Sequence, residues 1–362
     1  MPISAVDTVS LAVEHTKQQL FKPFRFGQWT KLAVVGLLAG ELGSGSGCNF
    51  HLPTHPGTSP HGSIPGLPGV DIALLAGLIS ILVITGMLLG IIFMYVSSVM
   101  RFVLFDSILV KECYIRRGWN SRQGPGWKYF LWKLLYLLFM LGGMAVLVGI
   151  PAAFAFAAGW FTQPREHLLP LVLGGILLFF VVMIFLIAVA VIFVLTKDFV
   201  IPQMALENIS AIEGWRRLWP MIAADKSGYA GYLGLKIVMA IGAGIVVGIA
   251  TLILGLIIAV PTVGLSIVAV ITGKSAGLTW NAYTITVAIV VGSILLAFFF
   301  YLVALISVPV IVFFPAYSIY FFADRYPALN TALHPATTMA QAPAAIPRYE
   351  PPPLPPSAAP IG

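Results

Sequence analysis

Charged residues are scarce in this sequence. Of its 362 residues only 9% are charged, whereas 59% are hydrophobic, and the mean hydropathy is +0.97. An ordinary soluble domain has about 25% charged and roughly 45–50% apolar residues. So few polar side chains cannot cover a surface that faces water, which excludes a soluble multidomain protein. The composition predicts an all-α, polytopic membrane helical bundle.

Cysteine and acidic residues are also few. The only cysteines are Cys48 and Cys113, and the topology argued below puts them on opposite sides of the membrane, so we expect no disulfide between them. Thirteen acidic against twenty basic residues give a net charge of +7. In a membrane protein this excess reports orientation and contact with anionic lipid. Nucleic acid is not expected as a partner, because that needs a basic face on a soluble domain.

Long apolar runs dominate the chain. A helix needs about 20 apolar residues to cross a hydrocarbon core of ~30 Å. Five runs reach this length easily, and a sixth, at the beginning of the chain, is shorter. The six expected transmembrane helices cover residues 29–42, 72–100, 129–150, 168–195, 229–260 and 284–308, the last continuing to residue 322.

The short run 29–42 ends in Glu41 and could be re-entrant, so the charges around it decide its placement. Three basic residues precede it and a fourth, Lys31, lies at its start, the loop 43–70 contains no Lys or Arg, and a dense basic stretch follows the next run. Both basic stretches can lie in the cytoplasm only if 29–42 crosses the membrane. We therefore expect six spans with both termini cytoplasmic.

Three cytoplasmic stretches resemble one another. They open at Asp7, Asp106 and Glu207, which lie 99 and 101 residues apart. Each opening suits a helix N-terminus, and a basic residue follows ten places on. These basic residues are Lys17, Arg116 and Arg217. We predict three parallel repeats, about 1–100, 101–200 and 201–327, each an amphipathic helix followed by two spans. A competing alignment of 102–106 with 193–198 leaves the repeat boundaries open.

Beyond this membrane domain of residues 1–327, the composition changes. Residues 328–362 are rich in Ala and Pro and include the run 351–356 (PPPLPP). Such a segment cannot bury enough surface to fold, so we expect a disordered cytoplasmic tail with polyproline II character. A protein partner with an aromatic-lined groove could bind it, although a solvated tail is the favoured interpretation.

The loop between the first two expected spans collects side chains that bind metals. Imidazole and thiolate suit zinc or copper. The intervals of three, four and six residues match no structural zinc pattern, so a polar loop without metal is favoured and no cofactor is expected. The candidate ligands are Cys48, His51, His55 and His61.

Within the expected spans ionisable side chains are almost absent. Lys236 lies near the start of its span, and Glu41, Asp71 and Arg101 lie at span ends. In the six-span topology Glu41 and Asp71 share the extracytoplasmic mouth. Ion-coupled carriers usually keep an ionisable residue in the membrane, so the pattern argues against such a carrier and leaves lipid or apolar substrates open.

Clustered arginines mark the cytoplasmic side. With Glu112 and Glu213 they could bind a phosphate, but spacings of three to five residues also suit ion pairs within a helix and contacts to lipid headgroups. Ion pairs and headgroup contacts are favoured over a phosphate-binding catalytic site, because no catalytic group accompanies these residues. The residues expected to contact headgroups or a partner are Arg116, Arg117, Arg216, Arg217 and Lys17.

Some of these stretches occur together in a known family. Residues 199–208 (FVIPQMALEN), 213–219 (EGWRRLW) and 116–119 (RRGW) resemble the membrane domain fused to some bacterial glycerophosphoryl diester phosphodiesterases, and its stand-alone relatives. The resemblance covers about the central third of the chain and implies a bacterial inner-membrane protein. No stretch outside the spans is long enough for the catalytic barrel of that family, so no catalytic residue is carried over.

The leading functional hypothesis is therefore a non-catalytic inner-membrane scaffold or accessory subunit that contacts anionic lipid. A transporter or flippase-like protein for a lipid or apolar solute is the alternative, and a membrane-embedded hydrolase is third. A polar groove that reaches mid-membrane would favour transport, whereas a close-packed bundle would favour the scaffold.

Overall fold

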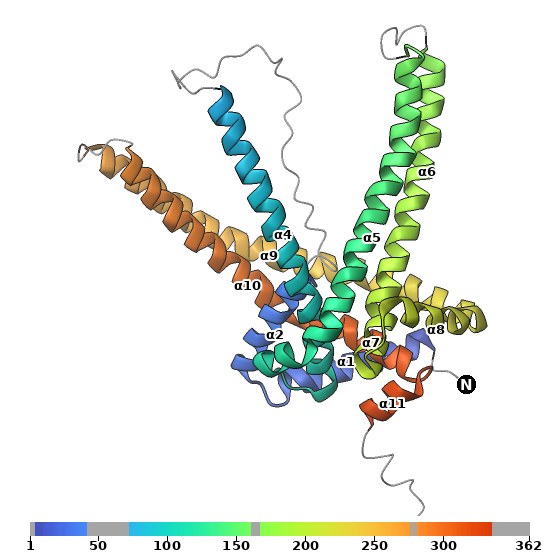
Figure 1. The fold of residues 1–362 in the computed structure, drawn as a ribbon. Coiled ribbons are helices and arrows are strands. Elements are labelled where there is room, and N and C mark those ends of the chain that lie inside the picture. The colour runs from blue at the N-terminus through green and yellow to red at the C-terminus, as the bar shows by residue number, and fades with distance from the viewer. Residues whose placement is uncertain (1–3, 42–71, 161–166, 276, 278–280, 335–362) are drawn as a thin grey trace, which may run out of the picture.

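The computed structural model describes residues 4–41, 72–160, 167–275, 277 and 281–334 (Figure 1). Over these residues the chain forms helices and no strand, which confirms the all-α class. The candidate metal ligands of the loop 43–70 and the proline run 351–356 lie outside the described residues.

Five helical segments are long and apolar enough to cross a membrane. They are α4 (Ile72–Val110), α5 (Ile115–Ala157), α6 (Leu168–Leu195) with its continuation, α9 (Lys226–Ser275) and α10 (Ala282–Ala323). α6 continues through the π-helical turn η1 (Thr196–Val200) into α7 (Ile201–Glu207). These five segments agree with the multi-pass membrane protein that the composition predicts.

The long helices diverge from a common base. Away from the base α4 stands by itself, α5 runs beside α6, and α9 runs beside α10; we call these outer parts the arms (Figure 1). The arms expose apolar side chains on all sides, such as Leu82, which is 73% exposed, and Ile257, which is 65% exposed. Such a surface suits lipid, where helices satisfy their backbone hydrogen bonds internally.

Shorter helices complete the base. They are α1 (Ala5–Phe21), α2 (Phe26–Ala39), α8 (Ala211–Ala224) and α11 (Pro327–Leu333). Ser4 and Ser210 cap α1 and α8, because their hydroxyls accept hydrogen bonds from the backbone N–H groups of Asp7 and Glu213. α1 and α11, near the two ends of the chain, both belong to the base (Figure 1).

The hydrophobic core lies in the base, where aromatic rings from several helices meet. Tyr232 of α9 stacks on Tyr317 of α10 with ring centroids 4.9 Å apart, and the ring of Phe199 lies 5.0 Å from Tyr232 and 5.1 Å from Phe322. All four of these side chains are fully buried. Helices that separate in the arms are therefore joined at the base by aromatic packing.

The crossing of α4 and α5 in the base depends on glycine. A Cβ atom on Gly126 would lie 2.6 Å from a methyl group of Val99, and one on Gly118 would lie 3.1 Å from Val103. The absence of side chains at these two positions lets the helix backbones approach closely.

The sixth expected span, residues 29–42, is not confirmed. α2 has 14 residues, which at 1.5 Å per residue gives about 21 Å, too short for the hydrocarbon core. It packs in the base along the last turns of α4: Gln28 donates a hydrogen bond to the carbonyl of Lys111, and Ser97 donates one to the carbonyl of Ala39.

The three-repeat layout is not confirmed either. Asp7 lies in the first turn of α1, as expected. Asp106, however, lies inside α4, because the buried apolar run around Phe102 and Ile108 keeps the helix going to Val110. Glu207 ends α7 and does not open a helix, since Asn208 adopts the left-handed conformation (φ 54°) there.

The prediction of a disordered tail is wrong for its first residues. Residues 328–333 belong to α11, which begins at Pro327 and fully buries Leu329. Proline is pre-organised for the first position of a helix, and the buried leucine anchors the turn to the base. Residues 335–362 lie outside the described part of the chain.

Helix α1 packs against the base through a buried histidine. His15 is 2% exposed, and its ring Nδ1 lies 3.1 Å from the hydroxyl of Tyr320. Burial, with Lys111 nearby, lowers the pKa of His15 to about 4. The imidazole is therefore neutral in the folded protein at pH 7.

This buried histidine predicts a loss of stability in weak acid. The unfolded chain binds a proton at His15 below about pH 6.5, whereas the folded chain resists it down to about pH 4, so stability falls as the pH drops between those values. We expect the purified protein to lose about 2 kcal/mol at pH 5 relative to pH 7, measured by thermal unfolding in detergent. His15→Gln should reduce this loss, and His334→Gln, at an exposed position, should not. Equal losses in wild type and His15→Gln would contradict the prediction.

Candidate functional site

Six ionisable side chains from five elements converge in the middle of the base. They are Glu41 after α2, Arg101 of α4, Lys133 of α5, Lys197 and Asp198 of η1, and Lys236 of α9, and we call them the central cluster. Lys133 is partly buried, and the other side chains are between 3% and 14% exposed. Buried charges persist only when they are paired, so the pairing defines the site.

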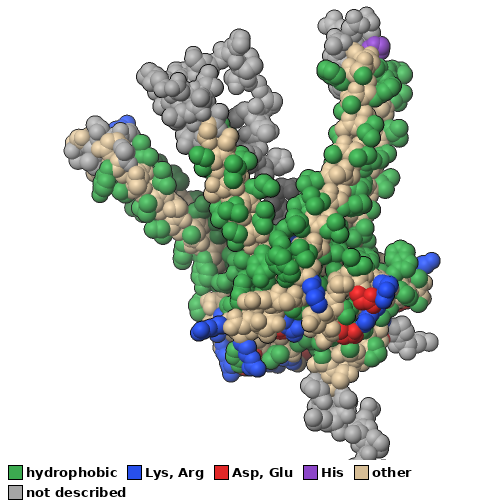
Figure 2. Space-filling model, viewed as in Figure 1, with side chains coloured by type: hydrophobic (Ala, Val, Ile, Leu, Met, Phe, Trp, Pro, Cys, Tyr) green, Lys and Arg blue, Asp and Glu red, His purple; other side chains and the backbone are tan. Residues whose placement is uncertain are grey.

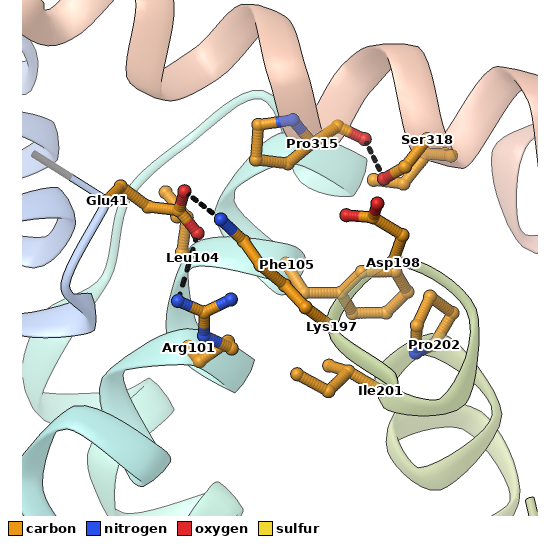
Figure 3. A pocket seen from close by; sticks show the side chains of 11 residues that line it. Glu41, Arg101, Leu104, Phe105, Lys197, Asp198, Ile201, Pro202, Pro315 and Ser318 are labelled. Atoms are coloured by element: carbon orange, nitrogen blue, oxygen red, sulfur yellow. Dashed lines mark hydrogen bonds and ion pairs between the residues drawn. The ribbon is translucent and has the colours of Figure 1, made fainter. Parts of the chain in front are cut away.

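Glu41 is bound from two sides. Arg101 Nη2 lies 3.2 Å from Glu41 Oε1, and Lys197 makes an ion pair with Oε2 (Figure 3). Arg101 Nη2 also donates a hydrogen bond to the carbonyl of Ala39 at 2.8 Å. Gly40 ends α2 in the left-handed conformation (φ 78°), which turns the chain so that Glu41 follows directly on the helix end.

Asp198 has a second set of partners. It forms an ion pair with Lys236 and accepts a hydrogen bond of 3.0 Å from the hydroxyl of the fully buried Tyr232. Lys197 and Asp198 are neighbours in the π-helical turn, yet they bind partners on different elements. Such wide turns inside helices occur often at functional sites.

Lys133 joins the cluster through a serine. Its Nζ donates a hydrogen bond to Ser97 Oγ at 3.2 Å, and Ser97 Oγ donates to the carbonyl of Ala39 at 3.3 Å. The same carbonyl accepts from Arg101. Lys133 therefore adds a further cation beside the Glu41 pair.

One expectation from the sequence is corrected here. The placement of Glu41 and Arg101 at opposite ends of the spans is wrong because the two side chains are in direct contact. Two lysines of long apolar helices also reach the cluster, Lys133 and Lys236. The sequence marks Lys236 near the start of its span, whereas Lys133 was not singled out as a site residue, although a single Lys in an otherwise apolar run is the signal for both.

Two of the expected surface residues lie together. Arg116 and Arg117 line a hollow of about 590 Å³ with Lys31, Tyr114, Ile115 and Asn120, which we call the basic hollow. Lys and Arg side chains gather at the base, whereas apolar side chains cover the arms (Figure 2). Lys31 was not among the predicted contacts, because it is distant from Arg116 along the chain and lies at the start of the short apolar run 29–42.

The other two arginines lie on α8 and are tied to acidic groups. Arg217 pairs with Glu213 at 3.1 Å and with Glu207 of α7, so it joins the two helices. Its hydrogen bond holds the pKa of the Glu213 carboxyl below its usual value. Arg216 pairs with Glu213 at 2.7 Å but its side chain is 78% exposed. Lys17 is exposed on α1 and lines neither the basic hollow nor the cluster.

The metal prediction concerns residues without a described position. Cys48, His51, His55 and His61 all lie between 42 and 71. Among the described residues no group of three or more His, Cys, Asp and Glu side chains is arranged to hold a metal ion.

Comparison with known proteins assigns a family. A family of unknown function, DUF7544, matches residues 3–332, from before the start of α1 to the next-to-last residue of α11. The chain belongs to the DUF7544 family. No match was found among curated proteins or among solved structures. For this DUF7544 protein the likeness to the phosphodiesterase membrane domain stays a prediction.

The ion pairs of Glu41 in the central cluster predict that Glu41→Gln strongly lowers the stability of the folded protein. The substitution leaves Arg101 and Lys197 buried without this carboxylate, and breaking a buried ion pair from one side costs about 3–5 kcal/mol. Thermal unfolding in detergent should show a large loss of stability. Glu14→Gln, at an exposed position of α1, should change stability by less than about 0.5 kcal/mol. Similar small effects of both variants would contradict the pairing.

Proposed function

We propose that this DUF7544 protein is a non-catalytic integral membrane protein, a scaffold or accessory subunit, that binds anionic lipid headgroups at its base. The observation that carries the proposal is the basic hollow, where Lys31, Arg116 and Arg117 from two different helices line one cavity. Exposed cations that converge from separate elements suit a phosphate group, since arginine binds phosphate oxygens in a bidentate manner.

The position of the hollow relative to the arms supports headgroup contact. The apolar arms fit the hydrocarbon core, and the basic side chains lie at the base from which the arms diverge (Figure 2). Basic residues of membrane proteins concentrate on the cytoplasmic side. We therefore place the base in the cytoplasm of a bacterial cell with the arms in the inner membrane. This placement puts α1 and α11, which both belong to the base, on the cytoplasmic side, and cytoplasmic termini remain a prediction from the charge pattern.

Helix α8 supplies a second surface of the same kind. Ile212 and Trp219, seven residues apart, are 69% and 68% exposed, and the exposed Arg216 lies between them in sequence. An exposed apolar pair with a tryptophan and a neighbouring cation is typical of a helix that lies at the membrane surface. Lys17 and the proline-rich tail remain predicted contacts for lipid and for a protein partner.

Cavity size argues for the scaffold over the transporter. The cavity at the central cluster has about 30 Å³, which is enough for about two water molecules. A lipid or an apolar solute needs a far larger passage. The aromatic packing around Tyr232 and Phe199 likewise closes this part of the base.

The basic hollow predicts a specific loss of lipid affinity. In the double variant Arg116→Gln/Arg117→Gln we expect binding of short-chain phosphatidylglycerol to weaken roughly 30-fold at low salt, since each basic residue near an anionic surface contributes about 1 kcal/mol. The measurement is a lipid titration of the detergent-purified protein, with phosphatidylcholine as the uncharged comparison.

The matched control removes the same charge elsewhere. Lys22→Gln/Lys274→Gln changes two exposed lysines that do not line the hollow, and it should leave the phosphatidylglycerol affinity within about two-fold of wild type. An equal loss in both double variants would mean that diffuse charge, not the hollow, binds the lipid, and the proposal would fail.

A further inference from the structure

The central cluster carries more positive than negative charge. Its cations are Arg101, Lys133, Lys197 and Lys236, and its carboxylates are Glu41 and Asp198, so the fully ionised cluster has a net charge of +2. The imbalance is held in the interior of the base, where water screens charge poorly. An uncompensated charge in such a place is unfavourable, which calls for a counter-ion.

Donor groups in the cluster are also left over. Arg101 is 6% exposed, and its Nη2 is used by Glu41 and the carbonyl of Ala39. Its Nε and Nη1 atoms are buried and have no hydrogen-bond partner among the described residues. Buried donors are nearly always satisfied in native proteins, so two free donors on one guanidinium indicate a missing acceptor.

A cavity adjoins these groups. It is lined by Arg101 and Lys197 together with Glu41, Asp198 and Ser318 and by apolar side chains of α4, α7 and α10 (Figure 3). Both carboxylates in its wall are already engaged by cations, Glu41 by Arg101 and Lys197, and Asp198 by Lys236. The surplus cations Lys133 and Lys236 lie outside this wall, so the groups that call for a ligand here are the unpaired Nε and Nη1 donors of Arg101, a residue that lines the cavity.

The size of the cavity selects the ligand. About 30 Å³ accommodates two water molecules or a halide ion, which is only slightly larger than water. A phosphate group with its four oxygens, or a lipid headgroup, does not fit. We propose that the central cluster of this protein is a binding site for a small monovalent anion such as chloride. This inference concerns a different site from the headgroup contact proposed above and does not depend on it.

The anion would act as a structural counter-ion for the base. The central cluster joins the end of α2 to α4, α5, η1 and α9, so neutralising it strengthens the junction from which the arms diverge. A ligand that binds only the folded state raises stability with its concentration.

The test is an anion series on the full-length, detergent-purified protein at constant ionic strength. Replacing gluconate by chloride or bromide should raise the unfolding temperature in a saturable way, by about 4 °C at an anion concentration of a hundred times the dissociation constant. Sulfate and phosphate should have no comparable effect because of their size. Equal effects of all the anions, or no effect of chloride, would overturn the proposal.

A variant locates the site. Arg101 variants risk losing the fold, so the informative change is Lys133→Gln at the partly buried edge of the cluster. It should weaken chloride binding at least five-fold, measured from the chloride dependence of unfolding and from line broadening in chloride NMR.

Lys31→Gln, in the basic hollow, is the matched control and should leave chloride binding unchanged. Unchanged chloride binding in Lys133→Gln would overturn the assignment to this cluster. The affinity of Lys133→Gln for phosphatidylglycerol should equal that of wild type. This second measurement distinguishes a failure of the anion site from a failure of the lipid proposal.

Discussion

The base of this DUF7544 protein depends on one buried interaction, the carboxylate of Glu41 held between Arg101 and Lys197. These three residues come from α2's end, from α4 and from η1, which are distant from one another in the sequence. Buried charges tolerate little displacement because a lost partner leaves an unsolvated ion. The register of α2 along α4, and the position of the turn after α6, are therefore fixed together by a single carboxylate.

The rest of the base is arranged around that constraint. Asp198 extends the network through its ion pair with Lys236 and its hydrogen bond from Tyr232. The ring of Tyr232 in turn packs against those of Tyr317 and Phe199. Polar and apolar contacts thus share residues, so the core cannot shift without disturbing the charges. The arms have no comparable network among their described side chains, and their apolar exteriors suit a solvent of lipid. This division explains how a chain with few charged residues concentrates them where helices meet.

Two sites of the protein bind charge for different physical reasons. The basic hollow is open and large enough for a phosphate group, and its cations are exposed, so its affinity falls with salt. The cavity at the central cluster is small, and the side chains of its ion pairs are largely buried, so their charges interact more strongly than exposed charges. A headgroup contact and a bound counter-ion are therefore separate properties of the same base, one at its surface and one in its interior.

Length, hydropathy and composition predict the helical class and the five long apolar segments, because these are local properties of the chain. The pair Arg116 and Arg117 is likewise visible in the sequence. Helix packing, by contrast, brings Lys31 beside them, makes α2 a short helix of the base, and buries Leu329 beyond the expected end of the domain. Glu41 is the clearest case. Hydropathy treats it as the polar end of a span, whereas its partners lie 60 and 156 residues further along the chain. Contacts over such separations depend on how helices pack, which no local pattern encodes.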